Sequence, residues 1–160
     1  MAGSYPGRPD YYPLPVAEVL IASDARWVVE EITAALSSVD DTVREVSRGQ
    51  DVLPAVAEQT PDIAVIDLQI GRMGGMATCL DLRLEEGAGR LPRVPVLMLL
   101  DRRPDVFLAR RAQAEGWLVK PLDALRVRKA ITTVLNGGSY EDDSYRPVTV
   151  VPAAAPTAGQ

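Results

Sequence analysis

The sequence predicts an α/β domain in which a parallel β-sheet is covered by helices on both faces. Three observations lead to this prediction. Short runs of aliphatic residues alternate with longer stretches whose apolar residues have helical spacing. Most of the aliphatic runs contain few polar residues, which is typical of strands that are buried on both faces of a sheet. Glycine or proline stands near several of the junctions, where elements begin and end.

Five segments have the composition of strands. Four of them are short apolar runs, whereas the second alternates apolar and polar side chains, as a half-exposed strand does. The five predicted strands are residues 18–22, 42–47, 62–67, 94–100 and 116–120.

Helices are predicted after each of these strands. In the first helix, apolar residues from Trp27 to Leu36 recur on one face, and we expect Trp27 to pack in the hydrophobic core. The second helix contains Pro54, which a helix tolerates only in its first turns. The fourth begins with proline, and Gly137 ends the fifth. The five predicted helices are residues 24–39, 49–59, 75–87, 104–115 and 122–136.

The two ends of the chain differ in composition from the predicted domain of residues 17–136. Residues 1–16 form an extended arm rich in tyrosine and proline, and residues 137–160 form a tail rich in proline and alanine. All tyrosines lie in these ends. Because tyrosine is frequent among interface anchors, we expect both ends to bind a protein partner or a large complex, the alternative being two disordered linkers. The predicted anchors are Tyr5, Tyr11, Tyr12, Tyr140 and Tyr145.

The overall composition excludes several classes of site. The chain has 22 acidic and 17 basic residues and a net charge of −5, which disfavours non-specific binding to nucleic acid. It has no histidine and one cysteine, so it can form neither an internal disulfide nor a structural zinc site. No stretch resembles a signal peptide, and the longest apolar run is too short to span a bilayer. We therefore expect a cytoplasmic protein without direct membrane insertion.

Three charged residues stand at the ends of predicted strands. Asp24 follows the first strand, Asp67 ends the third, and Lys120 ends the fifth. In a parallel sheet covered by helices, the carboxyl ends of the strands lie at one edge, where such sheets bind their ligands. The topology therefore predicts that these three side chains converge, although they are far apart in the sequence.

Residues 17–136 resemble the receiver domain of response regulators, the CheY-like family of two-component signalling. The resemblance lies in three motifs that occur in the family's order: VLIASDARWVVEEI, PDIAVIDLQIGRMGG and WLVKPL. It implies a flavodoxin-like, doubly wound five-stranded sheet with strand order 2-1-3-4-5. It places the phosphoacceptor at Asp67, its lysine partner at Lys120, the switch aromatic at Trp117 and a cis peptide bond before Pro121.

The resemblance also implies a magnesium site. Asp24, Asp67 and the backbone carbonyl of Gln69 match the family's ligands, and Mg²⁺ prefers such oxygen donors. Ser23, however, stands where the family has a further acidic residue, and it would reach a metal only through a water. We therefore expect Mg²⁺ binding to be weak or absent.

Two more departures fall at the end of the fourth strand. Leu100 replaces the family's threonine or serine and has no hydroxyl group to donate to a phosphoryl oxygen. A ligand shifts a conformational equilibrium only through contacts that differ between the two states. Without a hydroxyl group at position 100, phosphorylation would lack the contact that changes the conformation in this family. Asp101 follows where a small residue is usual, and we expect it to engage Lys120 or Arg102 and to hold one fixed state.

These features leave two functions open, and neither is enzymatic. The first is a degenerate receiver that acts as a protein-binding module or accessory subunit, docked through its ends. In its layout the chain is also similar to stand-alone receiver-like proteins that associate with the bacterial respiratory NADH dehydrogenase, which would place it at the periphery of a membrane complex. The alternative is a receiver that takes a phosphoryl group on Asp67 from a histidine kinase. Because only residues 137–160 follow the last predicted helix, we expect no output enzyme or DNA-binding domain.

Overall fold

All strands of the sheet run parallel, in the order β2-β1-β3-β4-β5-β6. The computed structural model describes residues 17–37 and 40–143. The doubly wound order 2-1-3-4-5 is confirmed, and a sixth strand extends the sheet beyond β5. The cis peptide bond between Lys120 and Pro121 is also present.

The strands are β1 (Glu18–Ala22), β2 (Thr42–Val46), β3 (Ile63–Asp67), β4 (Val96–Leu100), β5 (Gly116–Val119) and β6 (Tyr140–Glu141). The helices are α1 (Arg26–Leu36), α2 (Val52–Glu58), α3 (Gly75–Gly87), α4 (Val106–Arg111) and α5 (Ala124–Leu135). Pro54 lies in the first turn of α2, as its missing N–H requires. The helix predicted at 104–115 is shorter than expected, because the chain leaves the helical conformation at Gln113, where φ is 58°.

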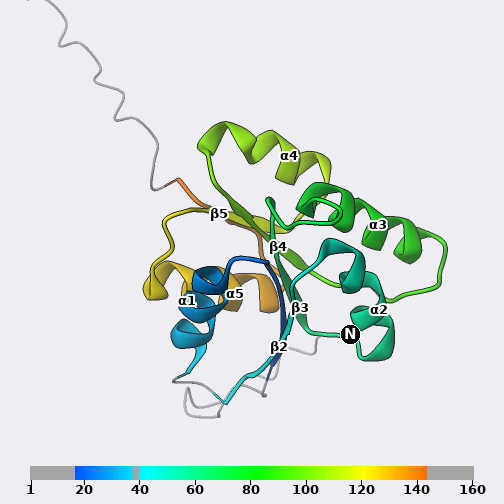
Figure 1. Ribbon diagram of the computed structural model, residues 1–160, viewed down its shortest axis with the longest axis horizontal. Helices are drawn as coiled ribbons and strands as arrows, with labels where there is room; N and C mark the ends of the chain where they lie inside the picture. The colour runs from blue at the N-terminus through cyan, green and yellow to red at the C-terminus, as the bar shows by residue number, and fades with distance from the viewer. Residues whose placement is uncertain (1–16, 38–39, 144–160) are drawn as a thin grey trace, which may run out of the picture.

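Helices cover both faces of the sheet (Figure 1). On one face α1 and α5 pack against the strands, and on the other face α2, α3 and α4 do so. Successive strand residues serve opposite faces: Leu20 belongs to one hydrophobic cluster and Ile21 to the other. Every residue of β3 and β4 is buried, which explains their unbroken apolar sequences. In the ranges described, no helix has both the length and the apolar composition needed to cross a membrane.

The single cysteine lies inside the second of these layers. Cys79 in α3 is fully buried, and its thiol Sγ–H donates to the carbonyl oxygen of Ala112 at 3.2 Å. Burial raises the pKa of this thiol to about 11, because the apolar surroundings disfavour the thiolate.

The boundary predicted for the C-terminal tail is wrong for its first residues. Tyr140 and Glu141 form β6, which pairs with Gly116 and Trp117 at the edge of β5. Tyr140 packs against the cluster under α1 and α5, and burial raises the pKa of its phenol. Gly137, with φ of 83°, lets the chain turn back after α5 and satisfy the backbone groups of β5. Tyr140 is thus part of the sheet, whereas Tyr5, Tyr11, Tyr12 and Tyr145 lie outside the described residues.

Two arginines share the same pair of carboxylates beside α3. Arg83 donates to Glu86 at 2.6 Å and to Glu115 at 2.8 Å, and its side chain is only 7% exposed. It also donates to the carbonyl oxygens of Val94 and Gln113, so it ties α3 to the segments before β4 and β5. Arg93 pairs with the same two carboxylates but is 54% exposed.

This arrangement predicts unequal losses of stability for two chemically identical truncations. Arg83→Ala should lower the free energy of unfolding by about 3 kcal/mol, because it leaves two mostly buried carboxylates with only the exposed Arg93 as their cation and removes the donor to two carbonyl oxygens. Arg93→Ala should cost under about 1 kcal/mol, since solvent screens that pair. Urea denaturation followed by circular dichroism measures both values. Equal losses in the two variants would contradict this account of the cluster.

Candidate functional site

Asp67 and Lys120 meet at the carboxyl edge of the sheet, as their positions in the sequence predict. Asp67 is the last residue of β3, and its side chain is 1% exposed. Lys120 follows β5, and its Nζ lies 2.7 Å from Oδ1 of Asp67. Because β4 lies between β3 and β5, the lysine side chain spans a neighbouring strand to reach the carboxylate. A buried carboxylate at this place is compensated by a cation in direct contact.

Both carboxylate oxygens of Asp67 accept hydrogen bonds from the protein. Oδ1 accepts from Lys120 and also from the backbone N–H of Gln69 at 3.2 Å. Oδ2 accepts from the hydroxyl group of Ser23 at 2.8 Å. Ser23 is itself buried, and its Oγ accepts from the N–H of Ala25, which orients the hydroxyl proton toward Asp67. Ser23 therefore contacts Asp67 directly, a role that the sequence interpretation did not give it.

Lys120 is shared between two carboxylates. Its Nζ also donates to Oδ1 of Asp101 at 3.2 Å, and the Asp101 side chain is 40% exposed. Arg102, the other partner considered for Asp101, pairs instead with Asp105 at 3.0 Å. The structure thus places Asp101 on Lys120, at the rim of the site.

Trp27 lies above the same ammonium group. Its ring centroid is 5.7 Å from Nζ of Lys120, within the range of a cation–π contact, and the residue is 48% exposed. The prediction that Trp27 packs in the core is wrong. It lies in the first turn of α1, while Val28, Val29 and Ile32 supply the buried face of that helix.

Asp24 has a different partner from Asp67. It is exposed, and its Oδ2 accepts from the backbone N–H of Gly71 at 3.1 Å, so it fastens the loop that follows β3. Within the described ranges, no group of three or more Asp, Glu, Cys or His side chains gathers closely enough to hold a metal ion. Asp24 and Asp67 are already engaged by two backbone amides, a hydroxyl group and an ammonium group. A Mg²⁺ ion at this place would therefore have to compete with these partners for the carboxylate oxygens.

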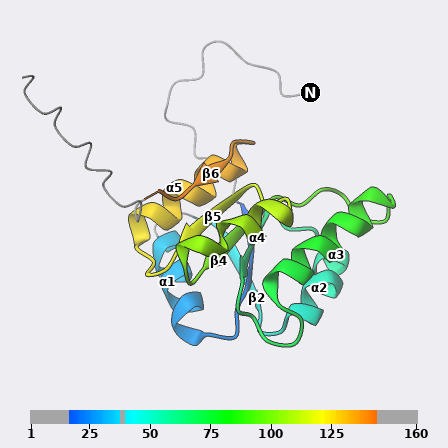
Figure 2. The same ribbon diagram turned by 90° about the horizontal axis from the view of Figure 1, so that it is seen from above.

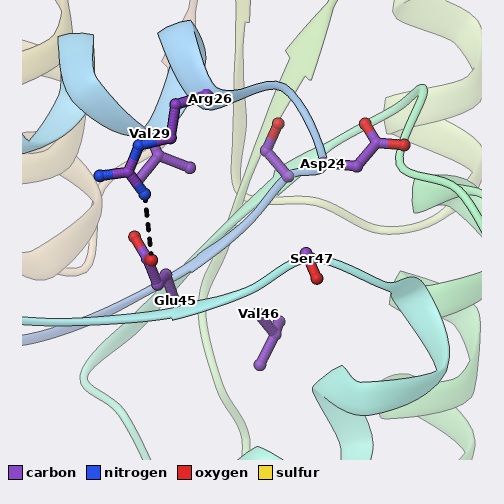
Figure 3. Close-up of a pocket in the computed structure, with 7 residues that line it drawn as sticks. Asp24, Arg26, Val29, Glu45, Val46 and Ser47 are labelled. Carbon is purple, nitrogen blue, oxygen red and sulfur yellow. Dashed lines mark hydrogen bonds and ion pairs between the residues drawn. The ribbon is translucent and has the colours of Figure 1, made fainter.

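A shallow hollow opens beside this site, between the start of α1 and the end of β2 (Figure 3). Asp24, Arg26, Glu45 and Ser47 line it, together with Ser23, Val29 and Val46. Arg26 and Glu45 form an ion pair of 3.2 Å at one side. Asp67 is not among the lining residues, but Ser23, which donates to it, is, so the hollow adjoins the carboxylate centre.

The end of β4 presents an apolar side chain. Leu100 is fully buried in the cluster under α2, α3 and α4. Trp117 belongs to the same cluster and is 5% exposed, with the guanidinium of Arg110 5.1 Å from its ring centroid. Leu100, which the resemblance matches to a hydroxyl-bearing residue, is therefore part of the hydrophobic core. The ring of Trp117 is also turned inward.

Gly75, at the end of the glycine-rich loop after Asp67, packs closely against the backbone of β3. A Cβ atom on Gly75 would lie 2.5 Å from the carbonyl oxygen of Asp67. Only glycine allows α3 to begin so close to the strand that carries the aspartate. The loop therefore brings α3 against the site.

The buried ion pair generates a stability prediction. Lys120→Met should lower the free energy of unfolding by about 3 kcal/mol, because Asp67 then stays buried without its cation. Asp101→Asn, at the exposed end of the same lysine, should cost under about 1 kcal/mol. The double variant Lys120→Met with Asp67→Asn should recover most of the loss, which a double-mutant cycle from denaturant unfolding would measure. Additive losses in the cycle would contradict a direct pair.

Comparisons with known proteins agree with this geometry. The family model of the response regulator receiver domain matches residues 19–132. Protein PilH of Pseudomonas aeruginosa is 25% identical over 122 residues, which cover 76% of this chain and all of PilH. The DNA-binding response regulator MtrA of Mycobacterium tuberculosis is 29% identical over 105 residues, which cover 64% of this chain but 43% of MtrA.

Solved structures show the same fold. The chemotaxis response regulator CheY4 of Vibrio cholerae superposes with a TM-score of 0.67 at 21% identity, covering 74% of this chain and 98% of CheY4. The signal receiver domain of NarL from Mycobacterium tuberculosis has a TM-score of 0.66 at 25% identity, covering 76% and 98% of the two chains. The family model matches most of this chain, and the aspartate–lysine pair is in place. The chain therefore belongs to the response regulator receiver family.

Proposed function

We propose that this receiver domain is a protein-binding module whose phosphoacceptor site is held in one state. The observation that carries the proposal is that both carboxylate oxygens of Asp67 already accept hydrogen bonds from the protein. Oδ1 accepts hydrogen bonds from Lys120 and from the backbone N–H of Gln69, and Oδ2 accepts one from the hydroxyl group of Ser23. Asp101 holds Lys120 from the solvent side. A phosphoryl donor would have to displace contacts that already satisfy the carboxylate.

The charge at the site supports weak or absent Mg²⁺ binding. Ser23 supplies a hydroxyl proton where the family has a carboxylate, and this proton points at Oδ2 of Asp67. A cation next to that oxygen would have to turn the hydroxyl group away and compete with Lys120 for the same carboxylate. Both effects lower the affinity for a divalent ion.

The apolar end of β4 supports a fixed state as well. Leu100 makes no hydrogen bond through its side chain and is fully buried, so a phosphoryl group on Asp67 would find no donor there. Without a contact that differs between two states, the modification has little free energy with which to move Trp117.

The partner is expected to be a protein, and the domain would act as an accessory subunit of a larger assembly. Tyr5, Tyr11, Tyr12 and Tyr145 remain predicted anchors, and they lie outside the described residues. The association with a respiratory NADH dehydrogenase also stays a prediction, because it depends on the layout of the sequence alone.

A phosphorylatable receiver is the second candidate. The retained contact of 2.7 Å between Lys120 and Asp67 favours it, since a lysine in that place could follow the charge onto a phosphoryl oxygen. In that case a histidine kinase would be the partner, and Asp67 would be the modified residue.

Magnesium titration separates weak binding from binding at the strength usual for a three-carboxylate site. Trp27 should show no saturable change in fluorescence below about 1 mM Mg²⁺, because the site offers two engaged carboxylates. Ser23→Asp should create or strengthen a saturable response at Trp27. Ser47→Asp, which adds the same charge in the neighbouring hollow, is the matched control and should not. A saturable response of the unmodified chain at sub-millimolar Mg²⁺ would contradict the prediction.

Beryllofluoride, a mimic of the phosphoryl group, tests the proposed function itself. With Mg²⁺ in excess, amide chemical shifts should change only around Asp67 and should leave β4, β5 and the Trp117 indole unchanged. Leu100→Thr with Ser23→Asp should extend the changes to Trp117, because it restores a hydroxyl donor and a metal ligand. Shifts at Trp117 in the unmodified chain as large as those at Asp67 would overturn the module and favour the phosphorylatable receiver.

A further inference from the structure

β6 lies along the outer edge of β5 (Figure 2). Tyr140 and Glu141 run parallel to Gly116 and Trp117, and the N–H of Tyr140 donates to the carbonyl oxygen of Glu115 at 3.2 Å. A Cβ atom on residue 116 would lie 2.6 Å from the carbonyl oxygen of Tyr140, and its three nearest atoms would all belong to Tyr140. Glycine at 116 is therefore what allows this strand to approach.

Asp142, the residue after β6, anchors the strand. Its side chain is 1% exposed, and its Oδ2 accepts from the backbone N–H of Val119 at 2.9 Å. The same oxygen pairs with the guanidinium of Arg126, which comes from α5. The N–H of Asp142 also donates to the carbonyl oxygen of Trp117 at 3.3 Å. This carboxylate is thus held from both the strand and the helix.

Asp142 and its partner Arg126 form hydrogen bonds with the backbone on both sides of Lys120. Val119, whose N–H donates to Asp142, directly precedes the lysine. Pro121, which directly follows it, accepts a hydrogen bond at its carbonyl oxygen from Arg126, the partner of Asp142. The N–H of Lys120 itself donates to the carbonyl oxygen of Leu100 at 2.8 Å. The buried carboxylate of Asp142 and its partly buried partner Arg126 therefore fix the peptide segment from which Lys120 reaches Asp67.

We propose that residues 140–142 are a positioning strap for Lys120, with Asp142 as the positioning residue. While the strap is docked, Lys120 is held on Asp67 and Asp101. When it detaches, the segment 119–121 loosens and the ammonium group becomes accessible. The chain continues beyond the strap to Gln160, so a protein that engages this end would act on the site without entering it. The proposal does not require Asp67 to be phosphorylated.

A glycine substitution detaches the strap without removing any polar group. Gly116→Ala places a methyl group against the backbone of Tyr140, whereas Gly87→Ala, the matched control, meets no atom within 4 Å. The readout is acylation of lysine by acetic anhydride, measured by mass spectrometry as the ratio of Lys120 to Lys129, the only other lysine. Gly116→Ala should raise this ratio about threefold or more, as expected when a protecting contact opens. Gly87→Ala should leave it unchanged.

A second pair of variants tests the anchor in the full chain. Asp142→Ala should raise the ratio as Gly116→Ala does. Asp142→Asn keeps an oxygen that can accept from Val119 and should therefore restore most of the protection. Hydrogen exchange of the Val119 amide reports detachment of the strap independently. Faster exchange at Val119 with an unchanged lysine ratio, or an unchanged ratio in both Gly116→Ala and Asp142→Ala, would overturn the proposal and leave β6 a purely structural strand.

Discussion

A buried carboxylate at the end of a central strand is the constraint on which the rest of this structure depends. β3 is buried on both faces, so Asp67 has little water to solvate its charge. Compensation comes from two other strands, with a hydroxyl group from the end of β1 and an ammonium group from the end of β5. Opposite Asp67 in the sheet stands Leu99 of β4, which offers no polar side chain. The lysine that follows β5 must therefore cross β4 to reach Asp67.

The replaced residues form a consistent set when they are viewed as charge and hydrogen-bond chemistry. Ser23 removes a negative charge from the site and adds a donor to Asp67, which lessens the need for a metal cation. Asp101 adds a carboxylate on the far side of Lys120 and keeps that ammonium group in place. Leu100 turns the end of β4 into hydrophobic core. Each change favours a site that is satisfied by its own side chains.

The alternation of apolar runs with helical stretches was sufficient to predict the first five strands, the layers and the meeting of Asp67 with Lys120. These features follow from burial, which leaves a strong pattern in the residues themselves. β6 could not be predicted, because two residues with one exposed side chain form no hydrophobic pattern and their pairing depends on a glycine in a distant strand. The position of Trp27 was missed for a related reason. Helical spacing identifies a face, but whether the first turn reaches the core depends on where the helix begins.

The placement of Cys79 has a consequence for the kinds of signal that the domain can register. With a pKa of about 11, only about one thiol in ten thousand is ionised at neutral pH, and the sulfur atom is enclosed by core. Oxidants react with exposed thiolates, so peroxide or a disulfide reagent has no target on the folded domain at this, its only cysteine. The folded domain therefore has no thiol-based response to oxidants, and a thiol reagent added to it would react only with molecules in which Cys79 has become exposed by unfolding.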